Sequence, residues 1–271
     1  MSSETLLSSV DRAAVAAVLA DLPQSLIINT ETGLDYQAVI TRIVDTKSDE
    51  VYNLAPLSDK KSISVDQIRD TIAKTITYST NRRIIIIDPA STMGPGAQNA
   101  LLKSLEEPNN NLFFILITSN PQLLLPTIIS RCQIINLHRT TPEQDDDLLR
   151  SLNVSPRSQQ QILFLAAGRP LLIRQLAQQP ELLEQGQSLV VASKTLLANN
   201  RYEKLKAIND YASDRSRAIQ LVDTLATIIQ FQLNQGRPTD TFDEIIDNLA
   251  DIKSQIANNS NLKLSLLKLV N

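Results

Sequence analysis

Apolar runs alternate with amphipathic stretches along the first half of the chain. Residues 83–87 read RIIII and residues 112–117 read LFFILI. Runs without polar positions are typical of strands that are covered on both faces. Shorter runs of the same kind extend the set, so the predicted strands are residues 25–29, 51–54, 83–87, 112–117 and 133–137.

Helices are predicted between these strands, where apolar positions recur every three or four residues. In the stretch 64–78, Ser64 and Gln67 have the spacing of a capping box, and Ile68, Ile72 and Ile76 share one face. Strands separated by helices predict a parallel sheet with right-handed crossovers. The predicted helices of this half are 10–22, 35–44, 64–78 and 97–106.

The pattern changes near His138, and no strand-like run follows from residue 141 onward. The predicted fold class is therefore α/β followed by all-α. We place domain boundaries near 139 and 185, which gives an α/β domain (1–138), a small helical domain (139–184) and a C-terminal helical domain (185–271). The predicted helices of this half are 142–152, 155–167, 171–178, 181–198, 202–211, 214–235, 241–257 and 262–270.

Composition narrows the classes of function. The 271 residues are 42% hydrophobic, which suffices for a core, and the net charge of −3 gives no general attraction to nucleic acid or to an anionic membrane. A single cysteine excludes an internal disulfide and a zinc site built on cysteines. The first 15 residues lack the pattern of a secretory signal, and no uncharged stretch approaches the length of a membrane span. We expect a soluble, cytoplasmic protein with no membrane contact.

The loop after the first strand is where an α/β protein would bind a nucleotide phosphate, because backbone amides and a helix N-terminus favour anions. It reads NTETGLDY over residues 29–36. A P-loop requires G-x-x-x-x-G-K-[ST], in which the lysine contacts the phosphates. This loop has one glycine, Gly33, no lysine, and two acidic residues, Glu31 and Asp35, which would repel a triphosphate. These residues favour an ordinary turn between strand and helix.

The strand at 83–87 is followed directly by Asp88 and Pro89. An apolar strand ending in Asp is the Walker B pattern, in which the carboxylate holds Mg²⁺ and an adjacent Glu polarises the attacking water. Proline cannot act as this base, and an Asp at a strand end is also a common cap of a turn. We interpret Asp88 as structural or as the remnant of a metal-binding position.

The stretches that follow carry a resemblance to a known family. GAQNALLKSLEEP (96–108) precedes LFFILITSNPQLLLPTIISRC (112–132), and ISVDQIRDTI (63–72) lies upstream. Together they resemble the clamp-loader branch of the AAA+ proteins, with the delta-prime and gamma/tau subunits of bacterial DNA polymerase III as the most similar members. The resemblance is dense over residues 62–137, weaker over 1–61 and architectural beyond 139.

The resemblance implies a AAA+ domain in which the chain's own ATP site has been lost. Tyr36 takes the position of the family's Walker A lysine, and Pro89 follows Asp88 where active members have Glu. Thr118 or Ser119 falls at the sensor 1 position, where a hydroxyl would face a γ-phosphate. We therefore expect no bound cofactor and no metal, with Gly33, Tyr36, Asp88, Pro89 and Thr118 as altered or unused positions of that site.

The sensor 2 position of the family falls on Leu171. Arg169 and Arg174 are near it in the sequence, but on a helix neither shares the direction of that position. This is a further departure from the pattern of an ATP-hydrolysing member.

Arg131, in the sequence Ser130-Arg131-Cys132, is the one catalytic candidate. In the resembled family this arginine is a finger that reaches into the ATP site of the neighbouring subunit. A guanidinium is permanently charged, and its fork of donors fits phosphate oxygens. The alternatives are an ion pair with a nearby carboxylate and a contact with nucleic acid, of which the acidic chain disfavours the second.

Two other side chains are ambiguous from the sequence alone. Lys103 is a candidate DNA contact, although a lone lysine is more often solvated. Cys132 is expected to be a packed residue and not a nucleophile, because the single histidine, His138, lies beyond the same strand and no other base is evident.

The predicted function is that of a delta-prime-like clamp-loader subunit that does not hydrolyse ATP. The resemblance implies gamma/tau-like and delta-like subunits, the sliding clamp and, through the complex, primed DNA as partners. It also implies that the C-terminal helical domain takes part in an oligomeric collar. Two alternatives remain: an ATP-hydrolysing gamma/tau-like subunit, against which Tyr36 and Pro89 argue, and a non-catalytic AAA+ interaction module outside replication.

Overall fold

A computed structural model describes residues 7–58, 60–75, 80–107, 111–198, 200–235, 243–257 and 260–270. Contacts divide the chain into two compact units, Met1–Gln159 with Ala166–Gln175 and Gln160–Leu165 with Leu176–Asn271. Each unit is described by itself. The predicted domain boundaries near 139 and 185 stay predictions.

The first unit is built on a five-stranded sheet in the order β2-β3-β4-β1-β5. All neighbouring strands pair in parallel, as predicted. In this order β3 and β1 both flank β4, so the loops that follow these three strands open at the same edge of the sheet. The strands are β1 (Ser25–Asn29), β2 (Glu50–Leu54), β3 (Arg83–Ile87), β4 (Leu112–Thr118) and β5 (Gln133–Asn136).

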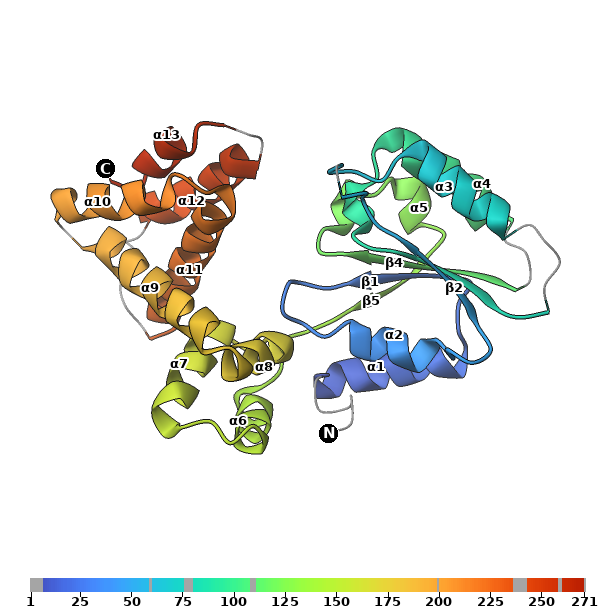
Figure 1. Cartoon of the computed structure of the whole chain (residues 1–271), viewed down its shortest axis with the longest axis horizontal. Coiled ribbons are helices and arrows are strands. Elements are labelled where there is room, and N and C mark those ends of the chain that lie inside the picture. Colours follow the sequence, from blue (N-terminus) through green and yellow to red (C-terminus); the bar gives the residue numbers. More distant parts are fainter. Residues whose placement is uncertain are drawn as a thin grey trace. The chain divides into compact units, whose positions relative to one another are not determined.

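Helices cover both faces of this sheet (Figure 1). On one face, α1 (Ser9–Ala20) and α2 (Gln37–Ile43) pack with the side chains of Ile28 and Ile117. On the other, α3 (Val65–Lys74), α4 (Pro95–Glu106) and α5 (Pro126–Ile129) pack over Ile85 and Phe114. Two apolar cores on opposite faces explain why β3 and β4 are almost free of polar residues.

Local signals account for the ends of several helices. The capping box predicted at the start of α3 is present: Gln67 N–H donates to Ser64 Oγ (3.2 Å) and Ser64 N–H donates to Gln67 Oε1 (3.0 Å). Pro95 occupies the first turn of α4, where a missing N–H costs little. The predicted last turn of the helix 64–78, with Ile76, and Pro108 beyond α4 lie outside the described residues.

The described residues after β5 form helices, as predicted. Two short 3₁₀ segments, η2 (Ala90–Thr92) and η3 (Pro121–Leu123), lie earlier in the chain, after β3 and after β4. In the second unit, α9 to α13 surround one core that includes Leu196, Leu221, Leu225 and Ile252. The helices are α6 (Pro142–Ser151), α7 (Pro156–Ala166), α8 (Pro170–Gln178), α9 (Pro180–Leu197), α10 (Arg201–Tyr211), α11 (Arg215–Asn234), α12 (Asp243–Ala257) and α13 (Leu262–Leu267).

Candidate functional site

Tyr36 and Asp88 meet at the edge of the sheet where a nucleotide would bind. Tyr36 is the N-cap residue of α2, Asp88 directly follows β3, and the Tyr36 hydroxyl donates to Asp88 Oδ2 at 2.6 Å. Burial and then this hydrogen bond raise the pKa of the Tyr36 phenol above its ordinary value. A neutral phenol thus lies on the carboxylate that, in the Walker pattern, would hold Mg²⁺. The structure joins two positions that the sequence had marked separately as altered.

Gly33 is fixed within its loop by the start of α8. Its φ of +96° is a conformation that favours glycine, and its carbonyl accepts from the N–H groups of Leu171 (3.0 Å) and Leu172 (3.4 Å). A Cβ at Gly33 would lie 3.1 Å from Cβ of Arg169. The carbonyl of the loop's one glycine therefore binds protein N–H groups, and the loop is packed against a helix end.

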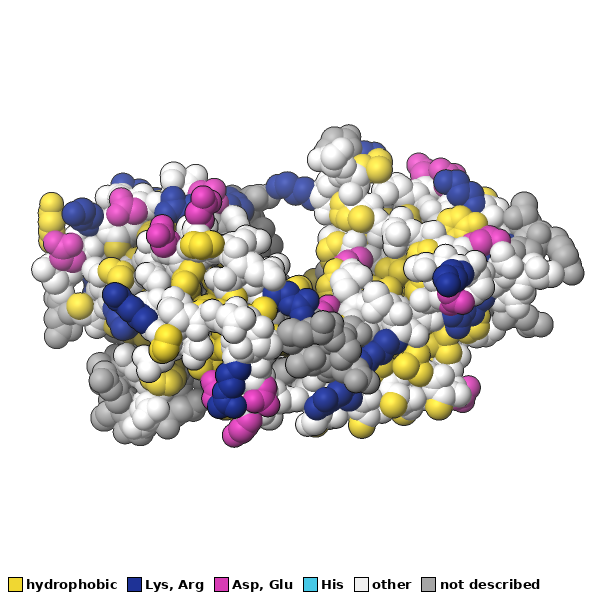
Figure 2. Space-filling model, turned by 60° about the horizontal axis from the view of Figure 1, so that its bottom comes forward, with side chains coloured by type: hydrophobic (Ala, Val, Ile, Leu, Met, Phe, Trp, Pro, Cys, Tyr) yellow, Lys and Arg dark blue, Asp and Glu magenta, His cyan; other side chains and the backbone are white. Residues whose placement is uncertain are grey.

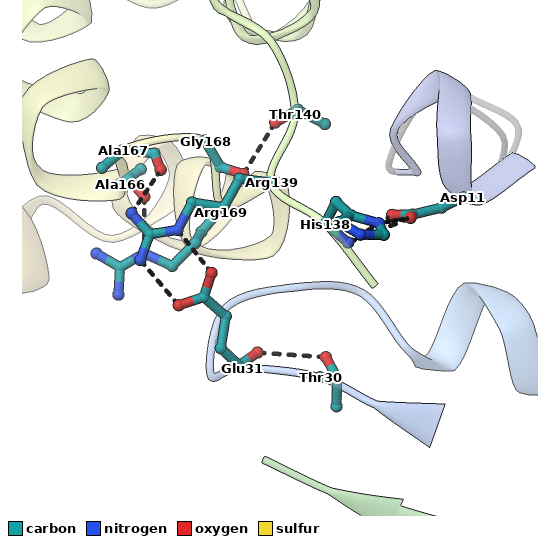
Figure 3. A network of polar contacts seen from close by, with 10 residues as sticks. All are labelled: Asp11, Thr30, Glu31, His138, Arg139, Thr140, Ala166, Ala167, Gly168 and Arg169. Carbon is teal, nitrogen blue, oxygen red and sulfur yellow. Dashed lines mark hydrogen bonds and ion pairs between the residues drawn. The ribbon is translucent and has the colours of Figure 1, made fainter. Parts of the chain in front are cut away.

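Glu31, in the same loop, is paired with Arg139 (Figure 3). Arg139 donates from Nε to Oε1 at 2.6 Å and from NH2 to Oε2 at 2.8 Å, which is a two-point contact. The hydrogen bonds from Arg139 hold the pKa of the Glu31 carboxyl below its ordinary value. Glu31 therefore keeps a negative charge in the loop at neutral pH, as its sequence position suggested.

His138 and Thr140, on either side of Arg139, also contact other elements (Figure 3). The backbone N–H and the ring Nδ1 of His138 lie 3.0 and 2.8 Å from carboxylate oxygens of Asp11, a buried residue of α1. Thr140 donates from its backbone N–H to the carbonyl of Gly168 at 2.8 Å. Three consecutive residues thus tie the segment after β5 to α1, to the β1–α2 loop and to the turn before α8.

The remaining positions of the altered site carry ordinary structural contacts. Pro89 precedes the 3₁₀ segment η2. Thr118 is buried at the end of β4, and its hydroxyl accepts from the N–H of Asn120 at 3.1 Å. Ser119 is exposed. Arg169, which lies near the sensor 2 position, donates from Nε to the carbonyl of Ala166 at 2.7 Å. Thr118 lies on the strand between those that lead to Tyr36 and Asp88, so the structure brings the sensor 1 position to the same edge.

Arg131 follows α5 and its C-cap residue Ser130, on the short segment that leads into β5. Its NH2 group forms an ion pair with Oε1 of Glu106 at 2.8 Å, and NH1 donates to the carbonyl of Thr127 at 3.0 Å. The side chain is 35% exposed. Of the sequence alternatives, pairing with a carboxylate is therefore present in the isolated chain, while the guanidinium stays accessible to another molecule.

The structure also shows the surroundings of Cys132, Lys103 and His138. Cys132 is half-buried against the core beneath α4 and α5, and burial raises the pKa of its thiol to about 11. A thiol that stays protonated at neutral pH is a poor nucleophile. Lys103 is exposed on α4, and His138 is engaged with Asp11.

Charged side chains are spread over the surface that Figure 2 shows. On the face shown in Figure 2, the described Lys and Arg side chains are dispersed singly or in small groups, with acidic side chains close to several of them. The described residues include no group of three or more His, Cys, Asp or Glu side chains able to hold a metal ion. No helix in the described part of the chain combines the length and apolar character needed to cross a membrane.

Sequence reasoning missed Arg139 and Glu106. Each is the partner of a residue that the sequence had singled out, Glu31 and Arg131. Neither carries a local signal, because the pairs join segments that only the folded sheet brings together.

Comparison with known proteins places the chain in a family. A family model described as DNA polymerase III, delta subunit, matches residues 5–141, half of the chain. The delta-prime subunit of DNA polymerase III from Pseudomonas aeruginosa is 36% identical over 132 residues, which are 47% of this chain and 40% of that protein. The Bacillus subtilis delta-prime subunit is 40% identical over 100 residues, 37% of this chain and 30% of that protein.

A solved structure shares the fold over nearly the whole length. The gamma subunit-related protein of DNA polymerase III from Thermotoga maritima superposes with a TM-score of 0.53 and 22% identity, covering 96% of each chain. The predicted AAA+ architecture and the resemblance to delta-prime subunits are confirmed. The aligned regions span less than half the length of the curated relatives. The chain belongs to the DNA polymerase III delta subunit family, and the curated relatives it resembles include delta-prime subunits of bacteria.

Proposed function

We propose that the chain is a delta-prime-like subunit of a bacterial clamp loader, does not hydrolyse ATP itself, and supplies Arg131 to the ATP site of a neighbouring gamma/tau-like subunit. The observation that carries the proposal is the 2.6 Å hydrogen bond from Tyr36 to Asp88. It ties a neutral side chain at the lysine position to the carboxylate at the metal position. The site that would use an arginine finger within this chain is altered, while the arginine is retained.

The residues around the former pocket support a subunit without ATPase activity. Hydrolysis needs a cation on the phosphates, a carboxylate on Mg²⁺ and a residue that orients the attacking water. Here these positions hold Tyr36, an Asp88 already bonded to it, and Pro89. In the loop that would face the phosphates, the charge of Glu31 is balanced by Arg139, and the sequence of the loop contains no lysine.

Arg131 has the chemistry of a finger acting on another subunit. Its charge does not depend on pH in the physiological range, and its planar group presents several donors to phosphate oxygens. In other NTPases where the effect has been measured, such an arginine accelerates hydrolysis by about 10³–10⁵. The exposure of the Arg131 side chain on the isolated subunit supports contact with a second protein.

The proposed partners follow from the family. They are gamma/tau-like and delta-like subunits, which would form the loader with this chain, the sliding clamp that the loader opens, and primed DNA reached through the complex. The proposed place of work is the cytoplasm. We also propose that the helices of residues 185–271 form this chain's part of the collar.

The test of this function is reconstitution with the gamma/tau-like, delta-like and clamp proteins of the same cell. We expect a complex of defined mass that contains this chain and hydrolyses ATP when clamp and primed DNA are present. A chain that forms no complex with these proteins would be an interaction module outside replication. Turnover of Mg·ATP by the isolated chain would instead indicate an active gamma/tau-like subunit.

A further inference from the structure

Arg131 is held in place by a residue on a different element. Glu106 is the last residue of α4, and its Oε1 lies 2.8 Å from NH2 of Arg131, which follows α5. The two side chains are 49% and 35% exposed, so the pair lies at the surface and both members reach solvent. A surface ion pair adds little to fold stability. Such a pair can nevertheless fix the orientation of the Arg131 guanidinium.

The other contacts of Arg131 come from its own turn. NH1 donates to the carbonyl of Thr127 at 3.0 Å and lies 3.4 Å from Oγ of Ser130. With Glu106, the two terminal nitrogens are held from two different elements. Among the described residues nothing accepts from Nε–H, so this donor is available to an acceptor on another subunit.

Helix α4 fixes both ends of the segment that carries Arg131. Near its start, Gln98 donates from Nε2 to the carbonyl of Leu123 (3.0 Å) and accepts from the N–H of Leu125 (2.6 Å), just before α5. At its end, Glu106 holds Arg131, just after α5. The four-residue helix α5 is therefore tied to α4 on both sides.

We propose that Glu106 is a positioning residue for Arg131, which sets the guanidinium in the orientation needed to meet phosphate oxygens of the neighbouring subunit's ATP. This inference rests on the proposed function of Arg131. A free arginine side chain samples many rotamers, and fixing one of them on binding has a cost. Glu106 reduces that cost, because the side chain is already ordered in the free subunit.

The experiment measures ATP hydrolysis by the reconstituted complex with Glu106→Gln, which keeps the shape of the side chain and removes its charge. In single-turnover traces, we expect the rate constant for one class of bound ATP to fall about 2- to 10-fold, the size of effect that freeing one long side chain produces, with the affinity for ATP and the mass of the complex unchanged. Glu107→Gln is the matched control: Glu107 is the next residue, its side chain is exposed, and the change removes the same charge. We expect that control to behave as the wild type.

The same change in an Arg131→Ala background separates positioning from other effects. If Glu106 acts through Arg131, the double variant hydrolyses ATP at the rate of Arg131→Ala alone. A further loss in the double variant, an unchanged single-turnover rate constant in Glu106→Gln, or a raised one would each overturn the role of Glu106. If Arg131→Ala itself leaves the rate unchanged, the finger role fails and this inference fails with it.

Discussion

At the scale of single residues, the Tyr36–Asp88 hydrogen bond shows how a tyrosine is accommodated at the position where the family pattern has a lysine. A lysine beside Asp88, with no phosphate bound, would form a half-buried ion pair. The contribution of such a pair to stability depends on how well both charges are solvated. A tyrosine fills similar space with a ring and meets the carboxylate with one hydrogen bond. We infer that the hydrogen bond from Tyr36 to Asp88 stabilises the fold.

The first prediction concerns this hydrogen bond. Tyr36→Phe should lower the free energy of unfolding by about 1 kcal/mol, because Asp88 loses its donor in a partly buried place. Tyr52→Phe is a suitable control, since the Tyr52 hydroxyl makes a longer contact of 3.3 Å with Glu50. Urea denaturation measures both variants, and an equal or larger loss for Tyr52→Phe would contradict the assignment.

The same residue predicts a pH dependence. The folded-state pKa of Tyr36 is raised above the ordinary 10.0, so the stability tied to its proton is fully present below pH 10.0. That stability is lost as the pH rises through the folded-state value. Above pH 10.0, the unfolding free energy of the wild type should therefore fall more steeply with rising pH than that of Tyr36→Phe. Parallel curves for the two proteins would show that Tyr36 does not carry this effect.

At the scale of elements, the β1–α2 loop is shaped by its contacts with α8 more than by its own residues. Gly33 has a positive φ, its carbonyl accepts two N–H groups from α8, and the space for a Cβ is limited by Arg169 and Leu172. The loop is thereby closed on a protein element at the position where a P-loop would surround a phosphate.

A glycine substitution tests this packing. Gly33→Ala should destabilise the fold by about 1–2 kcal/mol, because alanine is strained at this φ and its Cβ would come within 3.1 to 3.2 Å of neighbouring side chains. At Gly94 no atom lies within 4 Å of an added Cβ, so Gly94→Ala should change stability by less than about 0.5 kcal/mol. Thermal unfolding compares the two, and equal losses would count against a packed loop.

The elements themselves were largely predictable, and the contacts between them were not. The predicted limits of β1 and β3 are confirmed to the residue, because turn residues bound each apolar run. The strand predicted at 112–117 extends to Thr118, which pairs with Asn29 across the sheet. The helix predicted from residue 35 begins at Gln37, because the Asp35 side chain accepts from the N–H of Ala38 and so caps the helix.

For the candidate site too, the positions were predictable from the sequence and the contacts between them were not. Its positions could be found from motif spacing, which depends on neighbours along the chain. The pairs Tyr36–Asp88 and Glu106–Arg131 depend on strand order and on where α4 lies over the sheet, which no local pattern records. From the sequence, Glu31 was expected to repel a phosphate. Its ion pair with Arg139 is seen only in the structure.

At the scale of the whole molecule, the chain combines an α/β unit of AAA+ type with a second, helical unit that has its own core. A subunit that keeps a AAA+ fold without ATPase activity can still present surfaces to its neighbours. Family membership and the AAA+ fold are established by comparison, and the division of labour with other subunits is our proposal.

The isolated chain should not respond to nucleotide. A ligand at 100 times its Kd stabilises a protein by about 2.7 kcal/mol, which raises the melting temperature of a domain of this size by several degrees. We expect millimolar Mg·ATP to leave the melting temperature unchanged, while an ATP-binding gamma/tau-like subunit in the same buffer melts higher. A clear rise for this chain would mean that the pocket around Tyr36 still binds nucleotide.

The central claim is that Arg131 acts on ATP held by another subunit, and single-turnover hydrolysis by the reconstituted complex tests it most directly. In a complex with several ATP sites, a steady-state rate averages over all of them, whereas a single turnover resolves the slow site. With Arg131→Ala, we expect one class of bound ATP to be hydrolysed at least about 10²-fold more slowly. This lower limit is below the acceleration measured for other arginine fingers, because neighbouring residues of the ATP site remain in place. The mass of the complex should not change. Arg150→Ala, which removes an exposed arginine of α6, should leave every phase unchanged. Identical single-turnover traces for the wild type and Arg131→Ala would contradict the account.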